Sequence, residues 1–249
     1  MGISVGTAYY IGDINPSKHF GTRLNLAGGL MYRNNISRRI SVKGGLHYGR
    51  VEAYDADSDD PWQLNRNLSF RNEVIEGSLV GEINYFDYQI GDREDWVSPY
   101  LFLGIAYYSM RPEGEFEGTW YELQPLGTEG QGTTEGGTKY RTRGVAFPLG
   151  AGLKMNFFSI MALNIEWGMR KTFTDYFDDV SGNYVDPIIL ATENGQLSQI
   201  MADKSVSQEG IGQDNAGIQR GDPGRKDWYN FTTITLSFRL DKSPTSCWK

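Results

Sequence analysis

Hydrophobic and polar residues alternate with a period of two along three long segments of this chain. The clearest segment is 160–173, where large apolar residues such as Leu163 alternate with small or polar residues such as Glu166. The same alternation covers 145–157 and 232–240. Because successive side chains of a strand point to opposite faces, each segment predicts a long β-strand with one apolar face.

Five further segments alternate with weaker contrast, which brings the number of predicted strands to eight. Each predicted strand has roughly 10 to 14 residues, whereas a typical globular strand has about five or six. A tilted strand needs about 9 to 11 residues to cross a membrane, so these lengths indicate membrane-spanning strands. The five weaker segments are roughly 2–11, 24–33, 39–52, 73–86 and 98–109.

The connections between the predicted strands alternate in length. Short turns at one end and long loops at the other are typical of outer-membrane barrels, whose turns are periplasmic and whose loops lie outside the cell. An even number of strands puts both termini on the periplasmic side. The short connections are 34–38, 87–97 and 158–159, and the long ones are 12–23, 53–72, 110–142 and 174–227.

The pattern therefore predicts an all-β fold: an eight-stranded antiparallel up-and-down transmembrane β-barrel with long extracellular loops and a plugged lumen. The barrel covers 1–240, and 241–249 form a short periplasmic tail. We expect the protein in a bacterial outer membrane, surrounded by its lipids.

A soluble barrel of the lipocalin type or a β-sandwich is the alternative, because these folds also alternate. Their polar face is solvated and rich in Lys, Glu and Asp, whereas the polar face here consists mostly of Gly, Ala, Ser, Thr and Asn, which suits a crowded interior. Aromatic residues near the strand ends, where interfacial girdles lie, also favour the membrane barrel. They are Tyr9, Tyr32, Tyr85, Tyr107, Phe157, Phe173 and Trp228.

Composition argues against several other classes. The 249 residues carry a formal net charge of −7, which argues against nucleic-acid binding. One cysteine and two histidines leave almost nothing for a zinc site, and we expect no metal and no cofactor. The first ten residues lack the basic and apolar regions of a signal peptide, so the chain is either cytoplasmic or has lost its leader, and the strand pattern favours a removed leader.

The interior of an eight-stranded barrel is just wide enough to be filled by side chains, so the fold predicts no pore. The inward positions of the predicted strands carry charges of both signs. Because an unpaired charge in a dry interior is costly, we expect an internal ion-pair network and no proton or ion path. The inward charged residues are Arg33, Lys43, Glu76, Glu82, Lys154, Glu166, Arg170 and Arg239.

A catalytic barrel would need a nucleophile beside a base, and the sequence offers no such pair. His47 faces inward between Gly45 and Gly49, and we interpret it as a lumen histidine with satisfied hydrogen bonds. His19 lies in the first loop beside Ser17, without a nucleophile motif. We therefore expect no enzymatic activity and no small-molecule substrate.

Two acidic stretches, 55–60 and 175–179, fall in the long loops. We expect solvated charge there; calcium binding is the alternative, although neither stretch has EF-hand spacing. The segments 127–137 and 195–224 are rich in small or polar residues and are predicted to be mobile loop tips. Cys247 in the tail is either a free thiol or one half of a disulfide with another chain.

Three segments resemble a known family: YYIGDINP at 9–16, RNLSFR at 66–71 and RKTFTDYFDDVSG at 170–182, of which the last is the most specific. In these segments, and over essentially its whole length, the chain resembles the PorG-like outer-membrane proteins of Bacteroidetes. The motif positions are Gly12, Asp13, Pro16, Asp175, Asp178 and Asp179.

The resemblance implies a non-catalytic outer-membrane subunit of the type IX protein secretion machinery. Such a subunit anchors or organises a periplasmic ring built from a lipoprotein and its partner, so its working surface is the periplasmic turns and the tail, where Cys247 could tie the barrel to the ring. Without the resemblance, two other functions stay open. One is a stand-alone OmpA- or OmpX-like barrel whose loops act as an adhesin or receptor, and the other is a soluble carrier of an apolar ligand.

Overall fold

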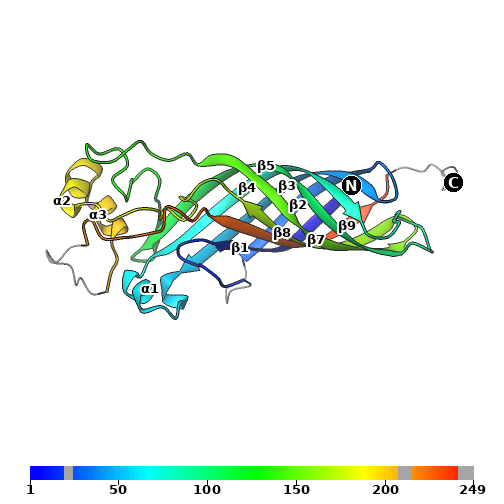
Figure 1. Ribbon diagram of the computed structural model, residues 1–249, viewed down its shortest axis with the longest axis horizontal. Coiled ribbons are helices and arrows are strands. Elements are labelled where there is room, and N and C mark those ends of the chain that lie inside the picture. Colours follow the sequence, from blue (N-terminus) through cyan, green and yellow to red (C-terminus); the bar gives the residue numbers. More distant parts are fainter. Residues whose placement is uncertain (20–24, 207–214, 241–249) are drawn as a thin grey trace.

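The computed structural model describes residues 1–19, 25–206 and 215–240. In these parts of the chain, eight long strands form a closed antiparallel barrel, which confirms the predicted fold class (Figure 1). Consecutive strands pair with each other, and the ring closes where β1 pairs with β9. The strands are β1 (Gly2–Ile11), β2 (Asn25–Asn35), β3 (Ile40–Tyr54), β4 (Ser69–Asn84), β5 (Val97–Phe116), β7 (Arg143–Phe158), β8 (Met161–Lys171) and β9 (Trp228–Phe238).

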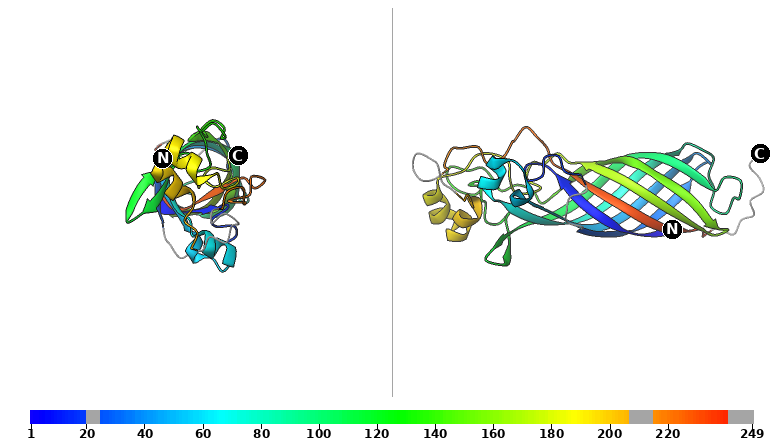
Figure 2. Two further views of the ribbon diagram at one scale, coloured as in Figure 1. Left: turned by 90° about the vertical axis from the view of Figure 1, so that its left-hand side faces the viewer. Right: turned by 90° about the horizontal axis from the view of Figure 1, so that it is seen from below.

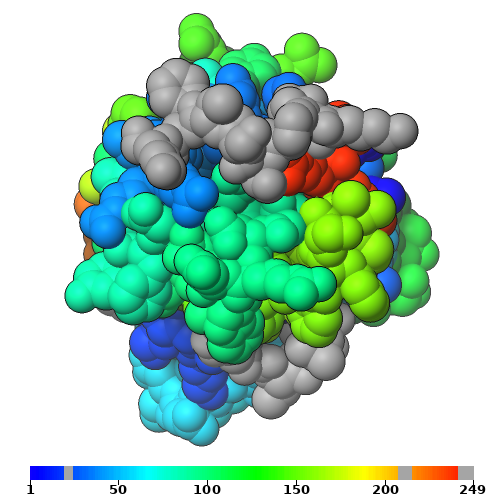
Figure 3. Space-filling model, turned by 90° about the vertical axis from the view of Figure 1, so that its right-hand side faces the viewer, coloured from blue at the N-terminus to red at the C-terminus, as the bar shows by residue number. Residues whose placement is uncertain are grey.

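The two ends of the barrel differ, as the alternating connection lengths predict. The turn end carries the short connections β2–β3, β4–β5 and β7–β8, together with Met1 and the last residues of β9. The loop end carries the long connections β1–β2, β3–β4, β5–β7 and β8–β9 (Figure 2). Figure 3 shows the turn end, where side chains of the β4–β5 turn fill the centre of the view.

The loops contain more regular structure than the sequence pattern indicates. β5 runs seven residues past its predicted end, to Phe116, and forms a hairpin with the short strand β6 (Thr119–Glu122). Its two-residue turn is Glu117–Gly118, with φ of 50° and 77°, as a type I′ turn requires. The loops also hold η1 (Asp55–Asp57), α1 (Pro61–Arg66), α2 (Pro187–Ile189), η2 (Leu190–Asn194) and α3 (Gln196–Ala202).

Large apolar side chains face outward along the middle of the barrel. From Ile75 of β4 to Tyr85, which directly follows this strand, every second residue points outward. Ten residues of a strand tilted by about 40° span roughly 25 Å, the height of a lipid-facing band. This inside-out arrangement is typical of a membrane-spanning barrel. The exposed apolar residues include Ile3, Val5, Leu26, Leu30, Leu46, Leu79, Ile83, Leu101, Leu103, Ile105, Leu149, Ile165, Ile234 and Leu236.

Aromatic side chains border this apolar belt. Tyr32, Tyr85 and Phe157 are exposed near the turn end, and Tyr107 and Phe173 near the loop end, at the heights predicted for interfacial girdles. Tyr9 and Trp228 differ from the prediction of a lipid-exposed girdle. Tyr9 belongs to a small cluster with Ile11 and Met169 on the outer face, and Trp228 packs against this cluster. Tyr9 is buried there and contacts the ring of His19.

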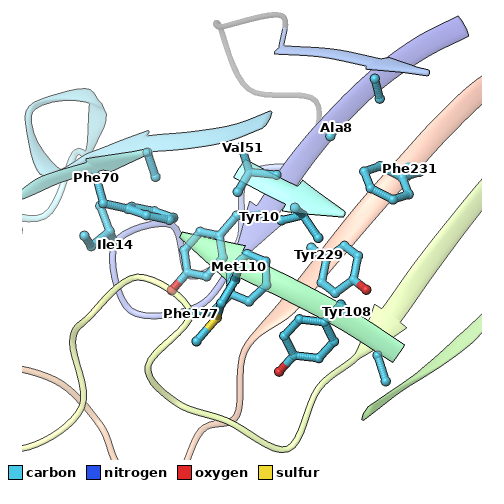
Figure 4. Close-up of a cluster of buried hydrophobic side chains, with 14 of the residues drawn as sticks. Ala8, Tyr10, Ile14, Val51, Phe70, Tyr108, Met110, Phe177, Tyr229 and Phe231 are labelled. Atoms are coloured by element: carbon cyan, nitrogen blue, oxygen red, sulfur yellow. The ribbon is translucent and has the colours of Figure 1, made fainter. Parts of the chain in front are cut away.

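The inside of the barrel is polar toward the turn end and apolar toward the loop end. The apolar part is a cluster of buried residues in which aromatic rings from several strands meet one ring from the β8–β9 loop, that of Phe177 (Figure 4). No described helix has the length and hydropathy needed to cross a bilayer.

Candidate functional site

The lumen holds a cluster of charges near the turn end, centred on Glu82 of β4. Its carboxylate accepts from Lys154 Nζ at 2.6 Å and lies 2.8 Å from Arg33 Nε and 3.3 Å from Lys43 Nζ. The Ser41 hydroxyl donates a further hydrogen bond at 3.1 Å. All these residues sit at inward positions of β2, β3, β4 and β7, because strand alternation turns every second side chain into the lumen.

Glu166 of β8 extends this cluster across the barrel. It accepts from Lys43 in a short ion pair and from the Tyr100 hydroxyl at 2.7 Å. The second partner of Lys154 is Asn84 Oδ1 at 2.7 Å. Glu82 and Glu166 are thus both buried and both paired with lysine, which is the arrangement that makes a charged interior tolerable.

A second cluster surrounds Glu76, closer to the loop end. Its Oε2 accepts from Arg170 Nε at 3.0 Å and from the Tyr229 hydroxyl at 2.9 Å. His47 faces the lumen as predicted, but its Nδ1 lies 3.6 Å from Glu76 Oε1 and neither atom has a hydrogen bond. The prediction of a satisfied histidine is therefore wrong at Nδ1, because β3 and β4 hold the two groups slightly too far apart.

One predicted lumen residue, Arg239, does not join these clusters. It follows the last residue of β9, and its Nη1 lies 3.3 Å from the carbonyl oxygen of Ile90 in the β4–β5 turn. It lies at the rim because β9 ends at Phe238, two residues earlier than the alternation over 232–240 predicts. All other predicted inward charges lie in the lumen, where Arg33, Lys43, Lys154 and Arg170 face Glu76, Glu82 and Glu166.

Above the charged clusters, aromatic rings close the loop end of the lumen. Phe177, fully buried, comes from the β8–β9 loop and stacks on Tyr229 at 5.2 Å between ring centroids and parallel to Tyr10 at 6.0 Å (Figure 4). Asn72 of β4 donates to the Phe177 carbonyl oxygen at 2.6 Å. Phe177 thus closes the loop end of the lumen as a stopper, and both its ring and its backbone carbonyl are held by the barrel wall.

Two buried arginines then tie the loops into one structure, which we call the loop cap. Arg66 of α1 forms a bidentate ion pair with Asp55, with both contacts at 2.7 Å. It also donates to the carbonyl oxygens of Asp13 and Arg220, at 3.0 and 2.7 Å. One guanidinium therefore joins the β1–β2, β3–β4 and β8–β9 connections.

Arg220 is the second tie of the loop cap and is as buried as Arg66. Its Nη1 donates to Glu129 Oε1 at 2.8 Å and to the Asp179 carbonyl oxygen at 2.6 Å. Glu129 in turn accepts from the backbone amides of Ser181 and Gly182. This tie brings the β5–β7 connection into the loop cap.

Contrary to the prediction, the acidic stretch 175–179 is not solvated. Asp175, Asp178 and Asp179 are buried, and their oxygens accept from Ser181, Tyr10 and Thr128, respectively. The stretch faces inward because Phe177 in its centre enters the lumen. In the other acidic stretch Asp55 is also buried, whereas its neighbours up to 60 are exposed or half-buried.

The Tyr10 hydroxyl bridges two of these buried carboxyls. It donates to Asp178 in a short hydrogen bond and lies 3.0 Å from Asp227 Oδ1. A phenol has one proton, so both contacts are hydrogen bonds only if one carboxyl is protonated. Burial raises the pKa of Asp178 and of Asp227 well above the usual range, and the neighbouring carboxylates Asp13 and Asp178 add to the two shifts.

The other motif residues also belong to the loop cap. A Cβ at Gly12 would lie 1.9 Å from the Tyr10 hydroxyl and 2.1 Å from Asp227 Oδ1, so only glycine fits there. Burial raises the pKa of Asp13 to about 6 and that of Asp179 to about 6. Pro16 is half-buried, and its carbonyl oxygen accepts from Arg225.

The segment 127–137 was predicted to be a mobile loop tip, but in the structure it packs against the β8–β9 connection. Thr128 and Thr133 are buried, and Asn194 of η2 donates to the carbonyl oxygens of Gly127 and Gln131 at 3.2 Å. The described parts of 195–224 contain α3 and the buried Arg220. Glycine allows the close packing of 127–137, since a Cβ at Gly127 would lie 2.2 Å from the Gln131 carbonyl oxygen and 2.9 Å from Asn194 Nδ2.

The described residues show no arrangement of the kind that nucleophilic catalysis or metal binding needs. No group of three or more His, Asp or Glu side chains among them could hold a metal ion. The two histidines contact Tyr9 and Glu76, and within the described chain neither is hydrogen-bonded to a serine. Cys247, the predicted disulfide candidate, lies outside the described residues.

Several solved structures are similar to this chain in fold, at identities too low to inform on function. Ail, the attachment invasion locus protein of Yersinia pestis, solved with the heparin analogue sucrose octasulfate, is 10% identical, with a TM-score of 0.42 and coverage of 96% of this chain and 97% of that chain. Neisserial surface protein A is 8% identical, with a TM-score of 0.41 and coverage of 96% and 95%. The N-terminal barrel domain of Pseudomonas aeruginosa OprF is 10% identical, with a TM-score of 0.35 and coverage of 95% and 97%.

No curated protein matches the chain in sequence. A family model does match it, over residues 1–199, which span β1 to β8 and the loop segments that build the loop cap up to α3. The chain belongs to the family described as Domain of unknown function (DUF6089).

Proposed function

We propose that this protein is a sealed, non-catalytic barrel of the bacterial outer membrane, with its loop end outside the cell and its turn end and termini in the periplasm. The observation that carries the proposal is the pairing of an apolar exterior with a lumen filled by ion pairs. Long loops lie outside the cell in such barrels and short turns lie in the periplasm, which supports this orientation.

Two barriers in series argue that the barrel is not a channel. The charged clusters around Glu82 and Glu76 occupy the lumen, and separating their ion pairs would leave buried charges uncompensated. Beyond them, Phe177 and Tyr229 close the loop end. An ion or solute would have to displace both layers.

We further propose that the barrel is a subunit of the type IX protein secretion machinery that anchors or organises the periplasmic ring. This proposal rests on the resemblance to PorG-like proteins, which is most specific at 170–182. In the structure this segment supplies Arg170 to the lumen, Phe177 to the aromatic stopper and Asp179 to the loop cap. A sealed barrel fits an anchoring role, since an anchor needs no conduit of its own.

A second candidate function, a stand-alone barrel that binds ligands or cells through its loops, is favoured by the ordered loop cap. The buried guanidinium groups of Arg66 and Arg220 hold all four long connections in one arrangement. Preorganised loops bind a partner with a smaller entropic cost than flexible ones.

Affinity purification from host membranes in mild detergent separates the two functions. We expect periplasmic ring lipoproteins to copurify, and a fraction of them to be lost on reduction if Cys247 forms the predicted intermolecular disulfide. Recovery of the barrel alone, together with cell or ligand binding that needs the loops, would instead favour the loop-display function. In planar bilayers the purified barrel should show no open-channel conductance; steady conductance would contradict the sealed lumen.

A further inference from the structure

Basic side chains on the outside of the barrel near the loop end fall into two groups. On β3–β5 they are paired: Arg50 Nη2 lies 3.2 Å from Glu73 Oε1, and Arg71 Nε lies 2.5 Å from Glu113 Oε2. Just before and on β7, and at the end of β8, they have no ion pair: within the described chain no carboxylate lies within ion-pair distance of them and their side chains form no hydrogen bonds. Lys171 Nζ lies 5.6 Å from the centroid of the Trp228 ring. These exposed cations, which we call the basic rim, are Arg141, Arg143 and Lys171.

The basic rim lies directly on the border of the lipid-facing belt. Arg143 is the first residue of β7, and the next outward residue, Val145, is already part of the exposed apolar surface. Lys171 at the end of β8 is paired in register with Phe147. The rings of Phe147 and Phe173 are exposed and meet edge to face at 5.4 Å, at the level of Lys171 and below Arg143 along β7.

This arrangement matches one kind of occupant. Arginine forks bind phosphate in a bidentate manner, and the Cα atoms of two arginines two residues apart are at most roughly 7 Å apart, within reach of one phosphate. A lysine at an interface extends its amine toward the headgroups while its stem stays in the apolar layer. A free anion would use only the cations, whereas a lipid would also cover Val145, Phe147 and Phe173.

We propose that the basic rim and the aromatic surface beneath it form a binding site for a phosphorylated lipid of the outer leaflet. The phosphate lies between Arg141 and Arg143, and the acyl chains lie along Phe147 and Phe173, beside Lys171. The site is one-sided, since on β3–β5 the carboxylates Glu73 and Glu113 already neutralise the arginines and would repel a phosphate. This inference rests on the membrane placement of the proposed function but not on its secretion role.

The test compares lipid retention by refolded barrels in phosphatidylethanolamine nanodiscs. Bisphosphorylated lipid A and its dephosphorylated form are added in equal amounts, and bound lipid is counted by native mass spectrometry after release. The test variant is Arg141→Gln/Arg143→Gln. The matched control is Arg50→Gln/Arg71→Gln, which removes the same charge from the paired side. Folding of each barrel is checked by its heat-dependent mobility on a gel.

We expect the unmodified barrel to retain more phosphorylated than dephosphorylated lipid. In the test variant, the ratio of the two bound lipids should fall about fivefold for each arginine removed. The control should keep the preference. Equal retention of both lipids by the unmodified barrel would overturn the proposal, and so would an equal loss in the control, which would indicate net charge alone. If the double variant does not fold, the single variants Arg143→Gln and Lys171→Gln decide in the same way. A barrel that does not insert into nanodiscs at all would overturn the membrane placement as well.

Discussion

The ring of Phe177, from the long β8–β9 connection, stacks on the ring of Tyr229 in β9 with 5.2 Å between centroids and 10° between planes. This contact joins a loop to the barrel wall directly above the charged lumen. The hydroxyl of the same Tyr229 points into the charged part of the lumen and donates a hydrogen bond to Glu76. Loop cap and lumen are therefore coupled through one tyrosine.

Replacing Phe177 by alanine should destabilise the protein by about 3–5 kcal/mol, because the ring is fully buried and leaves a cavity. The free energy of unfolding can be measured by urea titration of the refolded barrel in detergent. The matched control is Phe173→Ala, whose ring is exposed to lipid and whose loss should cost much less. Equal destabilisation by the two variants would show that Phe177 is not a stopper.

Replacing Glu82 by glutamine should destabilise the barrel by about 3–5 kcal/mol, since Arg33, Lys43 and Lys154 would lose the carboxylate they share. The double variant Glu82→Gln/Lys154→Met removes one of those cations and should recover part of the loss. Urea titrations of the single and double variants give the coupling energy. If the two changes simply add, the ion pair does not stabilise the lumen.

Replacing Arg66 by alanine should loosen the loop cap while leaving the barrel closed, because this guanidinium contacts three of the four long connections and no lumen residue. Limited proteolysis should cut the loops faster, and the heat-dependent gel mobility of the barrel should persist. The control Arg141→Ala removes an exposed arginine without an ion pair and should leave the proteolysis rate unchanged. Loss of barrel folding in Arg66→Ala would contradict a role confined to the loop cap.

The loop cap should weaken as pH rises from about 4. Burial raises the folded-state pKa of Asp13 and of Asp179 to about 6 and holds the pKa of Asp178 and of Asp227 well above the usual range, whereas an unfolded aspartate titrates near 3.8. Below 3.8 both states are protonated, and above it the unfolded state releases its protons first, so the free energy of unfolding falls with pH until the folded carboxyls ionise.

Hydrogen exchange of the loop amides between pH 4 and 8, corrected for the intrinsic rate, measures this dependence. The variant Asp178→Asn keeps a hydrogen-bonding side chain beside Tyr10 but cannot ionise, so its exchange protection should fall less steeply with pH. An equally steep fall in the variant would assign the dependence to other groups.

The eight strands followed from the sequence because barrel alternation is a local property. Each residue of a segment such as 160–173 reports which face it occupies without reference to the rest of the chain. The same alternation correctly predicted that Lys43, Glu82 and Glu166 point into the lumen. It misjudged Arg239, because alternation does not say where pairing stops.

What the sequence by itself determined was thus the barrel, its apolar exterior and the set of charges inside it. Only the tertiary structure decided which charges pair, since Lys43 meets Glu166 from a strand 123 residues away in sequence. It also decided the loop cap: the loops lack a repeating pattern, and their order comes from Arg66, Arg220 and Phe177 meeting partners on other connections. Periodicity specifies faces, whereas contacts between distant segments depend on how the whole chain closes.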